Sequence, residues 1–183
     1  GSGLAKNLIA HGFETTGFDL SAARLRAFAE IGGHAAQSVA EVAASADAVY
    51  VIVMTGDQAK SVILGPEGLA ARMPSGGGII LSATIKPSEA RAIGAAMQDA
   101  DVALIDSPVS GGFPGAQSGT LTMMAAGPKQ ALDQYADVMQ AVSKTIHRVG
   151  TSAGDGQTVK ACLQSLIGSI FSATFEASAL AAK

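Results

Sequence analysis

The chain has 183 residues, a net charge of −3, 48% hydrophobic residues and 15% charged residues. This length suits one domain, or one domain and the start of another, with a sizeable core. No basic cluster is present, which argues against nucleic acid or an anionic membrane surface as a partner. The longest apolar runs are far shorter than the ~20 residues that span a bilayer, so no membrane segment is expected.

A single cysteine, Cys162, cannot form an internal disulfide, and the three histidines are scattered without metal-ligand spacing. We therefore expect no metal site and a reducing, cytoplasmic setting. Cys162 lies two positions from Lys160 on one predicted helix and points to a different face. An ordinary buried apolar role is the expectation for it.

Short apolar strands alternate with amphipathic helical segments, a pattern typical of parallel βαβ units. The predicted strands cover residues 13–19, 48–54, 79–82, 102–106, 121–126 and 145–149. The first predicted helix ends at Gly12, and the second is capped by Ser21 and ends at Gly32. Ser38 caps a third helix and Pro87 starts a later one. Two more helices are predicted at 128–142 and from Thr158 onward.

The sequence thus predicts an α/β fold with a doubly wound, mostly parallel, Rossmann-type sheet. Residues 48–54 are apolar without interruption, which suits a strand covered on both faces. The last helix is long and apolar, with Phe171 and Phe175 at helical spacing. Such a helix must pack against another domain or a partner subunit, so a homo-oligomer is expected.

Two stretches carry the chemistry. A short apolar strand leads into Asp106-Ser107-Pro108-Val109-Ser110-Gly111-Gly112. The two glycines have no side chains, which leaves backbone N–H groups open to an anion. Downstream, Gly154-Asp155-Gly156-Gln157-Thr158-Val159-Lys160 leads into the apolar helix, where an ammonium is costly to bury without a purpose. A surface stripe of Lys160 with Gln164 is the alternative interpretation.

These two motifs resemble the β-hydroxyacid dehydrogenase family, which includes 3-hydroxyisobutyrate, L-threonate and tartronate-semialdehyde enzymes, and the resemblance covers essentially the whole chain. It implies that Ser110, Gly111 and Gly112 hold the substrate carboxylate. It also implies that Lys160 is the general acid/base, moving the hydroxyl proton while a nicotinamide takes the hydride.

The start of the chain, Gly1-Ser2-Gly3, resembles the family's segment from the third glycine of its Gly-x-Gly-x-x-Gly turn onward. Gly1 is then that third glycine, which lets helix and strand pack closely in this motif, and it is assigned to the cofactor-binding residues. The family's first strand and first two glycines do not occur here, and its last helix continues into an all-helical domain. We therefore expect part of a longer protein, with a NAD-binding domain at 1–157 and the start of an interdomain helix at 158–183.

Asp19 follows Gly1 at about the 20-residue spacing of a carboxylate that binds the adenosine ribose hydroxyls. A carboxylate there repels the 2′-phosphate of NADP and favours NAD. A solvated turn or a helix cap that competes with Ser21 is the alternative role for Asp19. Arg24 and Arg26 follow closely and offer a phosphate partner, so NADP stays open.

Further cofactor contacts are expected where central strands end. Met54 and Thr55 stand where the family has a leucine-proline pair that lines the nicotinamide side, although a simple turn fits them nearly as well. Thr84 resembles a family threonine that approaches cofactor and substrate, with helix capping as its alternative. Gln164 stands where the family commonly has asparagine, and it resembles the L-threonate type, so it is predicted to orient the substrate hydroxyl.

The predicted function is hydride transfer between a small hydroxy acid and NAD. Reduction of a semialdehyde, which is the same equilibrium run in reverse, remains a rival. A dinucleotide-binding module without turnover is the rival from another class.

Overall fold

A computed structural model of the chain describes residues 1–182. The strands are β1 (Thr16–Gly17), β2 (His34–Ala35), β3 (Ala48–Val51), β4 (Gly78–Leu81), β5 (Ala103–Asp106), β6 (Val109–Ser110), β7 (Leu121–Ala126) and β8 (Ser143–Gly150). The helices are α1 (Ser2–Ala10), α2 (Ala22–Glu30), α3 (Val39–Ser45), α4 (Gly56–Leu64), α5 (Leu69–Arg72), α6 (Pro87–Ala96), α7 (Gly112–Ser118), α8 (Lys129–Gln134), α9 (Ala136–Gln140) and α10 (Asp155–Ala181).

A six-stranded sheet in the order β3-β4-β5-β7-β6, with β8 also paired to β7, forms the centre of the molecule. β3, β4 and β5 are parallel, and β8 is parallel to β7. β7 runs antiparallel to β5 and β6, which a short connection through β6 and α7 permits without a crossover helix. β1 and β2 form a separate parallel pair. The mostly parallel sheet of the prediction is confirmed.

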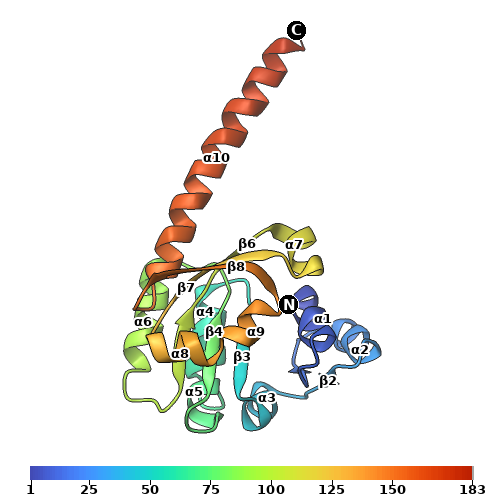
Figure 1. The fold of residues 1–183 in the computed structure, drawn as a ribbon, viewed down its shortest axis with the longest axis vertical. Helices are drawn as coiled ribbons and strands as arrows, with labels where there is room; N and C mark the ends of the chain where they lie inside the picture. Colours follow the sequence, from blue (N-terminus) through green and yellow to red (C-terminus); the bar gives the residue numbers. More distant parts are fainter. Residues whose placement is uncertain (183) are drawn as a thin grey trace.

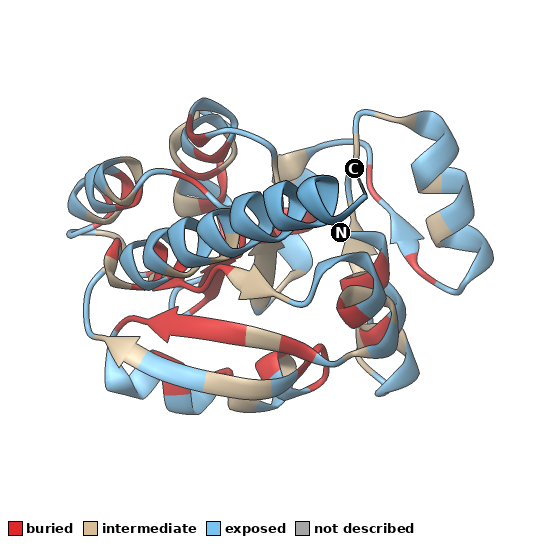
Figure 2. Cartoon of the chain, turned by 90° about the horizontal axis from the view of Figure 1, so that it is seen from above, coloured by how far each residue is buried: buried red, intermediate tan, exposed pale blue. Residues whose placement is uncertain are grey.

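Helices cover both faces of this sheet (Figures 1 and 2). Neighbouring residues of β4 point to opposite faces, so Ile79 joins a core with Ile63 of α4 and Ile93 of α6. Ile80 joins a second core on the other face with Leu132 of α8. Ile79 and Ile80 are both fully buried, which explains the unbroken apolar runs of the central strands. The doubly wound arrangement is therefore confirmed.

Several boundaries differ from the sequence prediction. β1 covers only Thr16–Gly17 of the strand expected at 13–19, and the helix expected at 128–142 divides at Tyr135 into α8 and α9. Helix α4 was not predicted, although Thr55 caps it by accepting a hydrogen bond from the Gln58 N–H at 3.2 Å. Helix α10 starts at Asp155 rather than Thr158.

The predicted helix starts are otherwise confirmed. Ser21 and Ser38 cap α2 and α3 through their hydroxyls. The Glu41 carboxylate accepts a hydrogen bond from the Gln37 N–H at 2.7 Å, and Pro87 occupies the first turn of α6.

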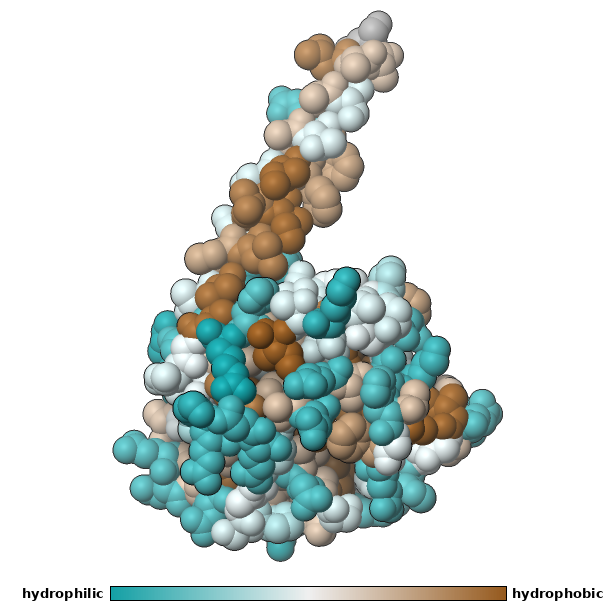
Figure 3. All heavy atoms as spheres, viewed as in Figure 1, coloured by the Kyte–Doolittle hydropathy of each residue, from teal (hydrophilic) through white to brown (hydrophobic). Residues whose placement is uncertain are grey.

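Helix α10 leaves the globular body as a long projecting rod (Figure 1). Apolar side chains lie exposed along it, as the space-filling view shows (Figure 3). The rings of Phe171 and Phe175 contact each other with centroids 5.9 Å apart, at the predicted spacing. Within residues 1–182, no helix combines the length and apolarity needed to cross a membrane.

Candidate active site

An open groove of about 440 Å³ lies where the parallel strands β3 and β4 end. Its walls come from the loop before α4, the loop before α6, and α10. The lining residues are Met54, Thr55, Gly56, Thr84, Ile85, Lys86, Pro87, Glu89 and Ala161. The structure thus brings together three residues that were predicted to contact a cofactor, at the sheet edge where open α/β folds bind ligands.

The side chains of these three residues differ in how free they are. Met54 is 86% exposed, and the Thr55 hydroxyl is committed to capping α4. Thr84 is exposed and does not cap α6, whose N-cap residue is Lys86. The capping alternative for Thr84 is therefore wrong, and its hydroxyl stays available to a bound molecule.

Lys160 lies beside this groove, since the next residue, Ala161, lines it. Lys160 is only 7% exposed, and burial lowers the pKa of its ammonium group. Across residues 1–182 no carboxylate forms an ion pair with it. A buried amine without an anionic partner spends more time neutral, which is the state a proton acceptor requires.

The next turn of α10 is solvent-exposed. Gln164 lies four residues beyond Lys160, on the same helical face, and its side chain is exposed. Cys162 is also exposed, so the prediction that it is buried among apolar residues is wrong. The body of the protein covers only the first turns of α10, which helical periodicity could not indicate.

The Ser-Gly-Gly segment adopts a conformation that requires its glycines. Gly111 has φ +128° and Gly112 has φ +60°, where a side chain is rarely tolerated. Ser110 ends β6, opposite Thr122 of β7, and Gly111 is the N-cap of α7. The first N–H groups of a helix have no intrahelical acceptor, so this turn presents donors suited to a carboxylate. The short strand and the helix on either side of it were not predicted.

Asp19 lies in the loop between β1, which belongs to the separate two-stranded sheet, and α2. One carboxylate oxygen accepts the Ser21 N–H at 2.8 Å, and the other lies 3.4 Å from the Arg24 guanidinium. Gly1 is exposed, and a Cβ on it would meet nothing within 4 Å among the described residues.

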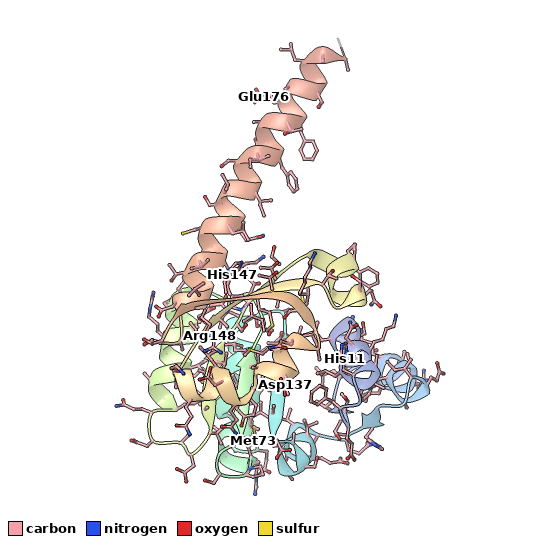
Figure 4. The ribbon with its side chains drawn as sticks, viewed as in Figure 1. His11, Met73, Asp137, His147, Arg148 and Glu176 are labelled. Atoms are coloured by element: carbon pink, nitrogen blue, oxygen red, sulfur yellow. The ribbon has the colours of Figure 1, made fainter. Side chains whose placement is uncertain are left out.

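A larger cavity of about 700 Å³ lies elsewhere, between α6, α8 and the starts of β4 and β5. It contains none of the predicted site residues. The labelled His11 and His147 are far apart on α1 and β8 (Figure 4). No group of three or more metal-ligating side chains occurs in the described part of the chain. The smaller groove is therefore the one that brings predicted site residues together.

Comparison with known proteins matches residues 1–150 to the family described as the NAD binding domain of 6-phosphogluconate dehydrogenase. The chain belongs to this family.

Individual relatives of this NAD-binding domain are hydroxyacid dehydrogenases. The L-threonate dehydrogenase of Cupriavidus necator is 37% identical over 180 residues, which are 98% of this chain and 61% of that protein. The NAD-dependent L-serine dehydrogenase of Pseudomonas aeruginosa is 33% identical over 98% of this chain and 60% of its own length. The chain therefore spans about three fifths of the length of these relatives, at 61% and 60%.

The fold agrees with the same group. The crystal structure of 3-hydroxyisobutyrate dehydrogenase from Salmonella typhimurium superposes with a TM-score of 0.91 at 34% identity, covering 100% of this chain and 64% of that one. The resemblance to β-hydroxyacid dehydrogenases and the Rossmann-type fold are both confirmed. The roles of the individual site residues and the division at residue 157 stay predictions, and Lys183 lies outside the described residues.

Two buried polar residues of the NAD-binding domain were not predicted as part of the site. Asp106 is 0% exposed and Gln157 is 1% exposed, and they are hydrogen-bonded to each other beneath Lys160. Burial raises the pKa of the Asp106 carboxyl group, and hydrogen bonds from Gln157 and Gly154 partly offset that shift. A signal for both was present, since each is a polar residue inside one of the two motifs, but only their sequence neighbours were assigned roles.

Two hydroxyls at the same edge have no partner. Ser82 and Ser107 directly follow β4 and β5, and their Oγ atoms are buried without a hydrogen bond among the described residues. Their places are adjacent because Leu81 pairs with Asp106 across the sheet. Buried polar atoms without hydrogen-bond partners are rare. Two of them side by side near Thr84 fit a binding site in which a bound molecule supplies the partners.

Proposed function

We propose that this chain binds the cofactor and carries the proton-transfer group of an NAD-dependent dehydrogenase that acts on small hydroxy acids. The observation that carries the proposal is Lys160: buried, with a lowered pKa and no carboxylate partner among residues 1–182, it lies next to a groove at the ligand-binding edge of the sheet. The names of the relatives support the same chemistry.

The cofactor fits the residues present. Asp19 would bind the adenosine ribose, Gly1 would lie near the cofactor phosphates, and Met54, Thr55 and Thr84 would line the nicotinamide side of the groove. The bound nicotinamide supplies the hydride acceptor. The Asp19 carboxylate favours NAD, but its contact with Arg24 leaves a cation beside the ribose position, so NADP remains a candidate.

Around the substrate, each residue has a separate task. The backbone of Ser110, Gly111 and Gly112 would bind the carboxylate through open N–H groups. The neutral Lys160 amine would accept the hydroxyl proton as the carbon loses its hydride. The Gln164 side chain would contact the hydroxyl groups from the next turn of α10.

For the substrate, we propose L-threonate first and 3-hydroxyisobutyrate second. Gln164 can bond to a further hydroxyl of a sugar acid, and the most identical relative described above is an L-threonate dehydrogenase. Reduction of a semialdehyde would use the same residues in the opposite direction.

The assembly and setting are also part of the proposal. The exposed apolar side chains of α10 support a homo-oligomer, which size-exclusion chromatography with light scattering would test. A cytoplasmic setting is expected, and no nucleic acid or membrane partner is proposed.

The deciding experiment offers L-threonate and 3-hydroxyisobutyrate to the protein at its full natural length, with NAD and NADP in parallel. We expect NAD reduction with at least one of the acids, and its loss in Lys160→Ala, which should still bind NAD. Cofactor binding without turnover on any small hydroxy acid would instead support a dinucleotide-binding module.

A further inference from the structure

Helix α10 is attached to the body of the protein by polar contacts. Its buried residues are Gly156, Gln157 and Lys160, so no large apolar side chain of the helix is buried within the described chain. Apolar burial, the usual means by which a helix is fixed, is therefore a minor contribution at this junction. Whatever sets the position of Lys160 must act through the polar groups at the start of the helix.

The glycines bring the helix close enough for such contacts. A Cβ on Gly156 would lie 2.5 Å from the Met124 carbonyl oxygen and 2.7 Å from that of Asp106. Gly154 has φ +98°, and a Cβ there would lie 2.6 Å from Arg91 Cγ. The backbone of the first turn therefore packs directly on the end of β5, on β7 and on α6.

Asp106 accepts hydrogen bonds from this first turn. Its Oδ2 atom accepts the Gly154 N–H at 2.7 Å and the Gln157 N–H at 3.1 Å. Its Oδ1 atom accepts the Gln157 side-chain amide at 2.9 Å. A carboxylate at the start of a helix also complements the helix dipole. One side chain from β5 thus satisfies N–H groups that would otherwise lack partners.

Gln157 extends the connection to the cofactor side of the groove. Its Nε2 atom donates to the Ala83 carbonyl at 2.9 Å, and its Oε1 atom accepts the Ile85 N–H at 3.1 Å. These two backbone groups flank Thr84, which lines the groove. Gln157 precedes Lys160 by three residues and shares its helical face. One amide side chain therefore joins the Thr84 loop to the turn that carries Lys160.

We propose that Gln157, oriented by Asp106, is a positioning residue that sets the distance and angle between Lys160 and the Thr84 loop. We call the two side chains the Asp106–Gln157 clamp. The clamp touches neither substrate nor cofactor. It acts by preventing α10 from tilting away from the sheet. Such a tilt would matter for the reaction, because a displacement of about 1 Å at a reacting group costs on the order of 100-fold in rate.

The kinetic test of the clamp rests on the proposed function, because it requires a hydroxy acid that the protein oxidises. Gln157→Met keeps the length of the side chain and removes its hydrogen bonds. We expect kcat, measured per folded protein, to fall by about 10- to 100-fold, while the KM of the hydroxy acid and the Kd of NAD change by less than about threefold. Asp106→Asn, the smaller change, should act in the same direction.

Thr158→Val is the matched control. Thr158 lies in the same turn, where its hydroxyl donates to the Gly154 carbonyl at 2.7 Å and accepts a bond from Arg91 at 3.3 Å. Neither hydrogen bond involves Asp106 or Gln157, so the kcat of Thr158→Val should stay at the wild-type value. If Asp106→Asn and Gln157→Met act through one clamp, the double variant should lose little more than the worse single variant.

A second measurement keeps the clamp testable apart from turnover. Competitive acetylation followed by peptide mass spectrometry measures the pKa of Lys160 without any substrate. In Gln157→Met and Asp106→Asn, the loosened turn should admit water, so the pKa of Lys160 should rise toward its ordinary value. If wild-type protein oxidises no hydroxy acid, the proposed function fails, and this shift still decides on the clamp.

Two results would overturn the inference. One is a Lys160 pKa that is the same in wild type and in both clamp variants. The other is a lower melting temperature with kcat per folded protein unchanged, because it would reduce Asp106 and Gln157 to a stabilising contact.

Discussion

Replacing Gly156 with alanine tests whether the close seating of α10 controls both stability and activity. The added Cβ would lie 2.5 Å from the Met124 carbonyl oxygen, whereas ordinary van der Waals contact begins at 3.4 Å. Both nearby oxygens belong to the backbone of central strands, Asp106 at the end of β5 and Met124 within β7, so the helix must move by up to about 1 Å instead. Alanine favours a helix over glycine by about 1 kcal/mol, and overpacking costs about 1–3 kcal/mol or more.

The net expectation for Gly156→Ala is a loss of up to about 2 kcal/mol in unfolding free energy. Because Lys160 moves with the helix, kcat should fall by on the order of 100-fold. Gly168→Ala is the matched control: it makes the same substitution in the same helix, and its Cβ meets nothing within 4 Å among the described residues. Measured on the 183-residue chain, that variant should gain about 1 kcal/mol through helix propensity alone.

Urea unfolding measures the first effect, and steady-state kinetics on the protein at its full natural length measure the second. The reasoning is refuted if Gly156→Ala is as stable as Gly168→Ala and as active as wild type. A loss of stability with full activity would contradict the link between helix seating and the position of Lys160.

Three further predictions concern other parts of the site. Lys160→Met should abolish turnover yet raise the unfolding free energy by about 0.5–2 kcal/mol, because it removes a buried amine without a carboxylate partner; urea unfolding with activity assays would check both. In wild type, kcat should rise with pH as Lys160 loses its proton, at a pKa below the ordinary value for lysine. The unfolding free energy should rise over the same pH range, since Lys160 in the unfolded chain stays protonated to a higher pH. A flat pH–rate profile would argue against Lys160 as the base. Asp19→Ala should shift the preference from NAD toward NADP by about tenfold in kcat/KM by removing a charge that repels the 2′-phosphate, and an unchanged ratio would remove Asp19 from the ribose site.

Local pattern was sufficient for much of the fold. The apolar run at 48–54 predicted a strand, and β3 lies within it, but only Val51 of β3 is fully buried because β3 stands at the end of the strand order. Ser21, Ser38 and Pro87 marked helix starts through local hydrogen bonds and backbone restriction, which depend on a few neighbouring residues. Helix α4 went unpredicted because Thr55 was interpreted as a cofactor contact or a simple turn, whereas its hydroxyl caps the helix.

The site divides in a similar way. The two motifs identified Lys160 and the Ser-Gly-Gly turn, since paired glycines and a lysine in an apolar helix are visible without coordinates, and the structure then gave both glycines a positive φ. The sequence could not show that Met54, Thr84 and Ala161 line one groove, because strand order and helix placement bring them together. It also misjudged Cys162, which is exposed because the body covers only the first turns of α10.

By itself, the sequence determined the α/β class and the chemistry-bearing motifs, because these follow from residue type and spacing, and the resemblance of those motifs indicated the family. Only the tertiary structure decided which groups are buried together. Asp106 and Gln157 read as an ordinary strand end and an ordinary helix residue, yet their side chains meet with less than 2% exposure at the base of α10. Burial is a property of packed neighbours, and so are the lowered pKa of Lys160 and the contact between Gln157 and the Thr84 loop.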